Sequence, residues 1–193
     1  MPRITELNRI TNETNISLYL NVDGTGKYEI DTGCGFFDHM LAQLSRHGMF
    51  DINIKAKGDL IIDSHHTVED VGIVLGRAFA ECLGDKNGIA RYGSMLIPMD
   101  ESLCMTAVDI CGRSNLIFNG EINGVMGTMD SELIYDFLKA FTDNSGITLH
   151  VNIMYGRNNH HKAEGVFKGV ARALREAVKI GEANDVPTTK GCL

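Results

Sequence analysis

Two copies of the motif His-His-x-x-Glu carry the residue types best suited to metal chemistry in this sequence. They occupy residues 65–69 and 160–164, so the second copy follows the first by 95 positions. On a helix the Glu lies about one turn after both imidazoles, which places the three side chains on one face. Imidazole and carboxylate without thiolate suit a divalent ion such as Mn²⁺, Fe²⁺ or Zn²⁺. A single copy could equally be a helix start with solvated His, where Glu favours the N-terminal dipole. The matched second copy favours metal binding.

The sequence around the two motifs is also repeated. Each Glu is followed by an apolar stripe at helical spacing, and a shift of 95 positions superimposes the stripes and places Arg77 on Arg172. Each motif is therefore predicted to begin an amphipathic helix. The repeat further predicts a duplicated chain, with residues 1–88 as the first half and residues 89–193 as the second half with a C-terminal tail. The segment Gly-Asp-Lys-Asn-Gly at 84–88 marks the expected boundary.

Apolar periodicity predicts the elements that position these motifs. In the first half we expect strands at 15–22, 27–31, 51–57 and 60–62 and a helix at 36–46. In the second half we expect strands at 103–109, 114–118 and 148–154, a loop at 120–127 and a helix at 129–142. The Asp-Gly-Thr-Gly turn at 23–26 predicts a hairpin of 15–22 with 27–31, and 114–118 is expected to pair with 103–109. The predicted class is α+β, with two β-β-α-β-α halves whose mostly antiparallel sheets pack their helices between them.

Composition excludes several classes of protein. The formal net charge of −7 argues against non-specific nucleic-acid binding, which needs a basic face. No apolar run reaches about 18 residues, so no membrane span is expected, and the N-terminal residues lack the apolar core of a signal peptide. The five cysteines are odd in number and lie in no paired zinc spacing, which indicates reduced thiols in a cytoplasmic protein. The aperiodic tail at 182–193 is expected to be a loop or lid, or disordered.

Three long segments are distinctive: Phe-Asp-His-Met-Leu at 37–41, Asp-Ser-His-His-Thr-Val-Glu-Asp at 63–70, and Gly-Arg-Asn-Asn-His-His-Lys-Ala-Glu at 156–164. Together they resemble the imidazoleglycerol-phosphate dehydratase family of histidine biosynthesis. The resemblance runs over nearly the whole chain. It implies a duplicated α+β fold, two Mn²⁺ ions per active site, and a homo-oligomer of 24 subunits whose active sites form between neighbouring chains. The implied reaction removes water from imidazole-glycerol phosphate to give imidazole-acetol phosphate.

The resemblance also implies roles for individual residues. The metal ligands would be His39, His65, His66, Glu69, His160, His161 and Glu164. Substrate contacts would come from Glu13, Gln43, Arg91, Arg113, Thr188 and Lys190, of which the last four would hold the phosphate. The catalytic residues would be Glu13, as the base for the C2 proton, with His66, Glu69, His161 and Glu164.

A few positions depart from the family pattern. Asp136 stands where many relatives carry His, and in the second half it holds the place that His39 holds in the first. A carboxylate can also ligate Mn²⁺, so Asp136 is either a changed metal ligand or a solvated helix residue. Cys34, Gly35 and Cys192 also depart from the pattern, but none of them touches the expected chemistry.

The chemistry of the implied substrate explains a need for two metal clusters. The hydrogen removed from C2 is not next to a carbonyl, so enolate formation is not available. Two Lewis acids on the imidazole nitrogens can convert the ring to imidazolate, which expels the C3 hydroxyl and gives a diazafulvene. Two other functions remain open from the residues: a two-metal hydrolase, and a protein whose metals only bridge the subunits of an assembly.

Overall fold

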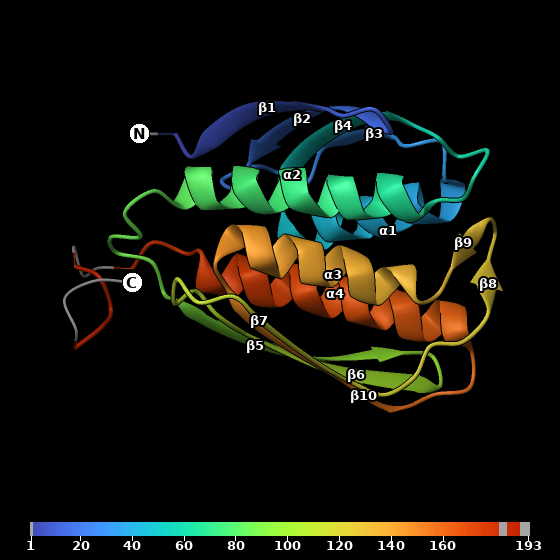
Figure 1. Cartoon of the computed structure of the whole chain (residues 1–193). Helices are drawn as coiled ribbons and strands as arrows, with labels where there is room; N and C mark the ends of the chain where they lie inside the picture. Colours follow the sequence, from blue (N-terminus) through green and yellow to red (C-terminus); the bar gives the residue numbers. More distant parts are fainter. Residues whose placement is uncertain (1, 182–184, 190–193) are drawn as a thin grey trace.

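The computed structural model describes residues 2–181 and 185–189, and its elements form layers in the order sheet, helices, helices, sheet (Figure 1). The first sheet has the strand order β1-β2-β4-β3. Its strands are β1 (Ile4–Ile10), β2 (Thr14–Asn21), β3 (Tyr28–Asp31) and β4 (Asp51–Gly58). Helix α1 (Gly35–Gly48) connects β3 to β4, and α2 (His65–Leu83) follows β4. Buried and exposed side chains alternate along β2. Its apolar residues Ile16, Leu18 and Leu20 are buried against the helices.

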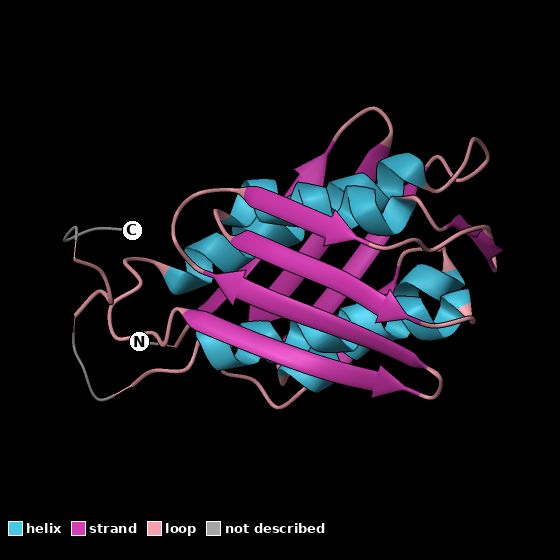
Figure 2. Cartoon of the chain, turned by 90° about the horizontal axis from the view of Figure 1, so that it is seen from below, coloured by secondary structure: helices cyan, strands magenta, loops and turns pink. Residues whose placement is uncertain are grey.

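The second sheet repeats this arrangement with the strand order β5-β6-β10-β7. Its strands are β5 (Tyr92–Met99), β6 (Ser102–Asp109), β7 (Asn115–Asn119) and β10 (Thr148–Tyr155). Its helices are α3 (Leu133–Ser145) and α4 (Asn159–Ala177), and a small antiparallel pair, β8 (Val125–Met126) and β9 (Met129–Asp130), precedes α3. Figure 2 shows this sheet from below, covering one face of the helices, with the first sheet behind them.

The helices of the two sheets meet in one core. Helix α2 packs along α3, and α1 packs along α4. The rings of Phe37, Phe137 and Phe167, from α1, α3 and α4, are almost completely buried there. Their centroids lie 5.3 Å apart for Phe37 and Phe137, edge to face, and 5.5 Å apart for Phe137 and Phe167, stacked. This shared core fixes the position of each half's helices relative to the other half.

The predicted fold class is confirmed, but both predicted hairpins are wrong. Strand β3 pairs in parallel with β4, and β7 pairs in parallel with β10. The turn at 23–26 does not form a hairpin because the Asp51 carboxylate accepts the N–H groups of Thr25 and Lys27, and β4 already occupies that edge of β2. Each sheet also has an edge strand, β1 and β5, that the sequence pattern missed, because neither strand has fully buried alternate side chains.

Smaller boundaries differ as well. Residues 60–62, expected as a strand, form a turn, and Ile61 is 97% exposed, so its apolar character was not a sign of burial. Helix α3 begins at Leu133 instead of residue 129, because Met129–Asp130, expected to be helix, pairs as a strand with Val125–Met126, expected to be loop. Most of the predicted tail, 182–184 and 190–193, lies outside the described residues. None of the helices in the described part of the chain is both long and apolar enough to cross a bilayer.

Candidate metal centre

The two His-His-x-x-Glu motifs lie at the first turns of α2 and α4, as predicted. Figure 1 shows that both helices begin at the same end of the molecule, beside β8 and β9. The start of α4 is firmly held. The side chain of Asn158 accepts from the backbone N–H groups of His160 and His161, as an N-cap does. Lys162 Nζ donates to the carbonyl of Glu121 at 3.0 Å, which ties this turn to the segment leading into β8.

One cluster brings together three of the predicted ligands. His39 Nε2 of α1 lies 3.1 Å from Glu164 Oε1, and His160 Nε2 lies 3.0 Å from the same oxygen. The three ligand atoms lie within 4.8 Å of one another. His39 and Glu164 are 125 residues apart in the chain, so the α1–α4 packing creates this cluster. Within residues 2–181 and 185–189, it is the one group of three such side chains close enough to share an ion.

The electrostatics of this cluster favour a cation. Glu164 is 7% exposed and also forms an ion pair with Lys168, one helical turn further along α4. Burial favours its protonated form, but hydrogen bonds from Lys168 and the two histidines hold the pKa of Glu164 at about 2. The carboxylate is therefore ionised at neutral pH, beside two imidazole nitrogens. This donor set fits a divalent ion of the Mn²⁺, Fe²⁺ or Zn²⁺ type.

The first motif places a related but looser group at the start of α2. His65 Nδ1 lies 3.7 Å from Asp136 Oδ2, and Asp136 sits in the first turn of α3. Asp136 faces the α2 motif across the α2–α3 contact, as His39 faces the α4 motif across the α1–α4 contact. Glu69 is exposed, one turn after His65. The structure thus brings His65 and Asp136 together, and it places Glu69 on the same stretch of helix.

The second histidine of each motif points to a different carboxylate. His66 Nδ1 lies 2.9 Å from Asp59 Oδ2, and His161 Nδ1 lies 2.7 Å from Glu101 Oε2. The hydrogen bond to Asp59 raises the pKa of His66. The hydrogen bond from His161, together with the N–H of Asn158, holds the pKa of Glu101 at about 2. Asp59 and Glu101 could not be predicted from the sequence, because carboxylates in connecting loops are common and nothing in their spacing connects them to the motifs.

Glu13 lies in the β1–β2 turn, with Oε1 3.8 Å from His66 Nε2. A hydrogen-bond network holds this turn against α2. Thr14 Oγ1 donates to Asp70 Oδ2 at 2.5 Å, and Arg9 Nε donates to Asp70 Oδ1 at 2.9 Å. Thr11 Oγ1 accepts the backbone N–H groups of Glu13 and Thr14. Because Asp70 directly follows the first motif, the network fixes Glu13 relative to His66.

Gln43 lies one turn after His39 on α1 and approaches it, with 3.5 Å between Gln43 Nε2 and His39 Nε2. On its other side, Gln43 Oε1 lies 3.0 Å from His47 Nε2. Burial, with the positive charges of Lys168 and Arg172, lowers the pKa of His47. A neutral His47 with its proton on Nε2 therefore donates to Gln43 and orients the amide beside the cluster.

The predicted phosphate residues are only partly brought together. The Arg91 guanidinium pairs with Asp109, with 2.7 Å between Nε and Oδ1, and donates to the carbonyl of Pro187 at 2.7 Å. Arg91 thereby holds the segment that carries Thr188. The side chain of Arg113 is exposed before β7. Lys190 lies outside the described residues.

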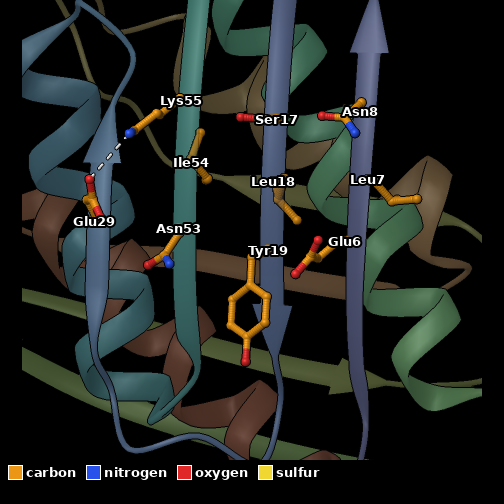
Figure 3. Close-up of a pocket in the computed structure, with 10 residues that line it drawn as sticks. All are labelled: Glu6, Leu7, Asn8, Ser17, Leu18, Tyr19, Glu29, Asn53, Ile54 and Lys55. Carbon is orange, nitrogen blue, oxygen red and sulfur yellow. Dashed lines mark ion pairs between the residues drawn. The ribbon is translucent and has the colours of Figure 1, made fainter.

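A hollow on the outer face of the first sheet is separate from these clusters. Figure 3 shows its lining, which includes Glu6, Tyr19 and Asn53 and the ion pair of Glu29 with Lys55. These side chains project from β1, β2, β3 and β4, and no histidine lines the hollow. It therefore contributes nothing to the candidate metal centre.

Fold and site together define a duplicated α+β protein that carries a histidine–carboxylate motif at one helix start in each half. Residues 32–174 match the sequence profile described as imidazoleglycerol-phosphate dehydratase. The chain belongs to the imidazoleglycerol-phosphate dehydratase family and is an enzyme of the hydro-lyase class.

Individual relatives support this assignment along the whole chain. The chain is 54% identical over 193 residues to the imidazoleglycerol-phosphate dehydratase of Clostridium botulinum (strain Langeland), with 98% of each chain covered. It is 53% identical to that of Azorhizobium caulinodans, covering 99% of this chain and 98% of the relative. Two solved structures share the fold. The Staphylococcus aureus enzyme matches with a TM-score of 0.84 and 37% identity, covering 92% of this chain and 99% of the other. The Pyrococcus furiosus enzyme, solved in complex with (S)-C348, matches with a TM-score of 0.85 and 34% identity, covering 97% and 100%.

Proposed function

We propose that this chain dehydrates imidazole-glycerol phosphate to imidazole-acetol phosphate in histidine biosynthesis, with two Mn²⁺ ions per active site. The observation that carries the proposal is the convergence of His39 and His160 on the ionised, buried Glu164. The duplication supports a second site from His65, Glu69 and Asp136, with His66 and His161 as further ligands. We also propose that the duplicated units are residues 1–88 and 89–193, since each contains one four-stranded sheet, two helices and one motif.

The residues of this chain have distinct tasks in the proposed reaction. Mn²⁺ ions bound at the two motifs supply Lewis acidity, which makes the substrate's imidazole a better acid. Glu13, near His66, is the proposed base for the C2 proton. Gln43 contacts the substrate from α1. Arg91, Arg113, Thr188 and Lys190 bind the phosphate, and the contact of Arg91 with the Pro187 carbonyl holds the neighbouring Thr188 near Arg91.

We further propose that the working enzyme is a cytoplasmic homo-oligomer of 24 subunits with active sites between neighbouring chains. His39 and Glu69 are exposed and His65 is partly exposed, which supports shared sites, because a neighbouring chain can reach these groups. The described cysteines Cys34, Cys82, Cys104 and Cys111 are free and buried, which fits a reducing compartment.

The test compares Glu69→Gln and Glu164→Gln with the wild-type enzyme in an assay of keto product from imidazole-glycerol phosphate. Both variants should lose turnover by at least about 100-fold and bind less manganese by elemental analysis, because an amide does not replace a charged ligand. Glu176→Gln is the matched control, since Glu176 lies on α4 outside the motif and its Oε2 accepts the backbone N–H of Ser94, which an amide oxygen can also do. Normal turnover in either motif variant would show that its cluster is not needed. Release of inorganic phosphate in place of keto product would identify a hydrolase.

A further inference from the structure

The second histidines of the two motifs, His66 and His161, are held in the same way. In both, the ring nitrogen Nδ1 faces a carboxylate oxygen, at 2.9 Å for Asp59 and 2.7 Å for Glu101. Neither contact belongs to the motif itself. Asp59 lies in the loop between β4 and α2, and Glu101 lies in the turn between β5 and β6. The two histidines therefore share one environment that comes from different parts of the chain.

The different origins of the two carboxylates matter. Asp59 is 7 residues from His66, whereas Glu101 is 60 residues from His161. A simple copy of the first half would place the second carboxylate in the β10–α4 loop. Since the same contact is built twice from non-equivalent loops, it meets a requirement of the histidine and is not merely inherited with the duplication.

That requirement follows from imidazole chemistry. A neutral imidazole carries one N–H and one bare nitrogen, and a carboxylate at Nδ1 accepts the N–H there. The bare nitrogen is then Nε2, which is the atom available to a metal ion. A second carboxylate lies near each Nε2: Glu13 Oε1 is 3.8 Å from His66 Nε2, and Asp100 Oδ2 is 3.6 Å from His161 Nε2. Both distances are too long for hydrogen bonds. In both rings Nε2 is thus turned toward acidic groups without being bound by them.

We propose that Asp59 and Glu101 are positioning residues that fix His66 and His161 in the Nδ1–H tautomer and aim each Nε2 at a metal ion. This inference rests on the ligand roles given to His66 and His161 in the proposed function. Outer carboxylates of this kind orient metal-binding histidines and raise their basicity.

Asp59 and Glu101 differ in their other contacts. Asp59 Oδ2 contacts His66, and Asp59 Oδ1 has no hydrogen-bond partner among the described residues. Glu101 has two tasks, since its Oε1 also accepts the N–H groups of Arg157 and Asn158 before α4. Asp59 is therefore the cleaner residue to change.

The experiment uses the full-length enzyme, stripped of metal and titrated with Mn²⁺ while the electron paramagnetic resonance signal of free Mn²⁺ is recorded. Asp59→Asn should weaken binding at the affected sites by about 10- to 100-fold. Glu101→Gln should do the same, with an added loss of thermal stability from the loop contacts. Asp63→Asn is the matched control, because Asp63 lies in the same loop and its Oδ1 accepts the backbone N–H of His65, which an amide oxygen can also do. Wild-type Mn²⁺ affinity in Asp59→Asn would overturn the proposal.

A second readout reports the tautomer directly and does not depend on metal or activity. Solid-state ¹⁵N spectra of histidine-labelled, metal-free enzyme, recorded at a pH high enough for the His66 ring to be neutral, should show the remaining ring proton of His66 on Nδ1. In Asp59→Asn the side-chain amide can donate to Nδ1, so the proton should shift toward Nε2. A wild-type His66 protonated on Nε2 would refute the inference even in an active enzyme. The expected tautomer and Mn²⁺ affinities in a protein that forms no keto product would refute only the proposed function.

Discussion

Replacing Gly76 with Ala should destabilise the protein, although Ala is the better helix former. Gly76 lies in the interior of α2, where Gly→Ala normally stabilises a helix by about 1 kcal/mol. Here an added Cβ would lie 2.6 Å from the carbonyl oxygen of Phe141 and 2.9 Å from Cβ of Asn144, both on α3. Carbon atoms normally pack at about 3.5 Å or more, so α2 and α3 must separate by roughly 0.5–1 Å. The glycine therefore sets the distance between the two halves at this contact.

The expected magnitude follows from the two opposing effects. Overpacking of a dense core costs about 1–3 kcal/mol, and more where the obstacle is backbone that cannot rotate away. After the gain in helix propensity, the net loss should be about 1–3 kcal/mol. For a chain of this size that corresponds to a fall in Tm of roughly 3–10 °C.

The assay is thermal unfolding at one protein concentration in chelator, because metal and subunit association both shift an apparent Tm. Gly35→Ala is the matched control: Gly35 begins α1, and an added Cβ would meet no atom within 4 Å. This control should leave Tm unchanged or raise it slightly. If Gly76→Ala raised Tm as well, the α2–α3 contact could accommodate the added methyl group. The glycine would then not set the spacing that places His65 opposite Asp136.

Three further predictions concern the ends of the chain and the assembly. The pKa of Asp23 is lowered chiefly by its hydrogen bond with Arg3, so this stabilisation is present above the unfolded value of 3.8 and is lost as pH falls through the lowered pKa. Urea unfolding of wild type and Asp23→Asn should therefore differ by roughly 0.2–1 kcal/mol at neutral pH and converge in acid. The difference is small because the Asp23 side chain is half exposed; a constant difference would contradict this. Truncation before Pro187 should raise KM for the phosphate substrate and leave manganese content unchanged; loss of metal would instead place the tail in the metal site. Chelation should shift sedimentation from a particle of many chains to a smaller species, and Mn²⁺ should reverse it, since metal shared between chains stabilises the assembled state; a full-sized particle without metal would exclude that role.

The sequence alone predicted the features that depend on local pattern. Two His-His-x-x-Glu motifs, each followed by an apolar stripe of period 3.6, predicted two helix starts with ligands, and α2 and α4 begin there. Period-two alternation at 15–22 and 148–154 predicted β2 and β10. The α+β class followed from the order of these elements. Side-chain periodicity is enough for such predictions, because burial of one face is the main force that selects helix or strand.

Strand neighbours were not decided by local pattern. The residues of a strand such as β3 do not indicate which strand it pairs with. The Asp-Gly-Thr-Gly turn before β3 is compatible with a hairpin. The structure inserts β4 between β2 and β3, since a connection through α1 lets β3 and β4 run parallel and covers the sheet with a helix. Both wrong hairpins have this cause.

Part of the candidate metal centre could be predicted from the sequence, and the tertiary structure decided the rest. The sequence supplied His160 and Glu164 on one helical face, but the third member, His39, reaches them only because α1 packs on α4 across the core. Asp59 and Glu101 meet their histidines through loop geometry that no periodicity encodes. A motif fixes distances within one helical turn, because the helix is rigid over that length. Distances between elements are fixed only when the chain buries its apolar faces together, and that packing decides which polar groups meet.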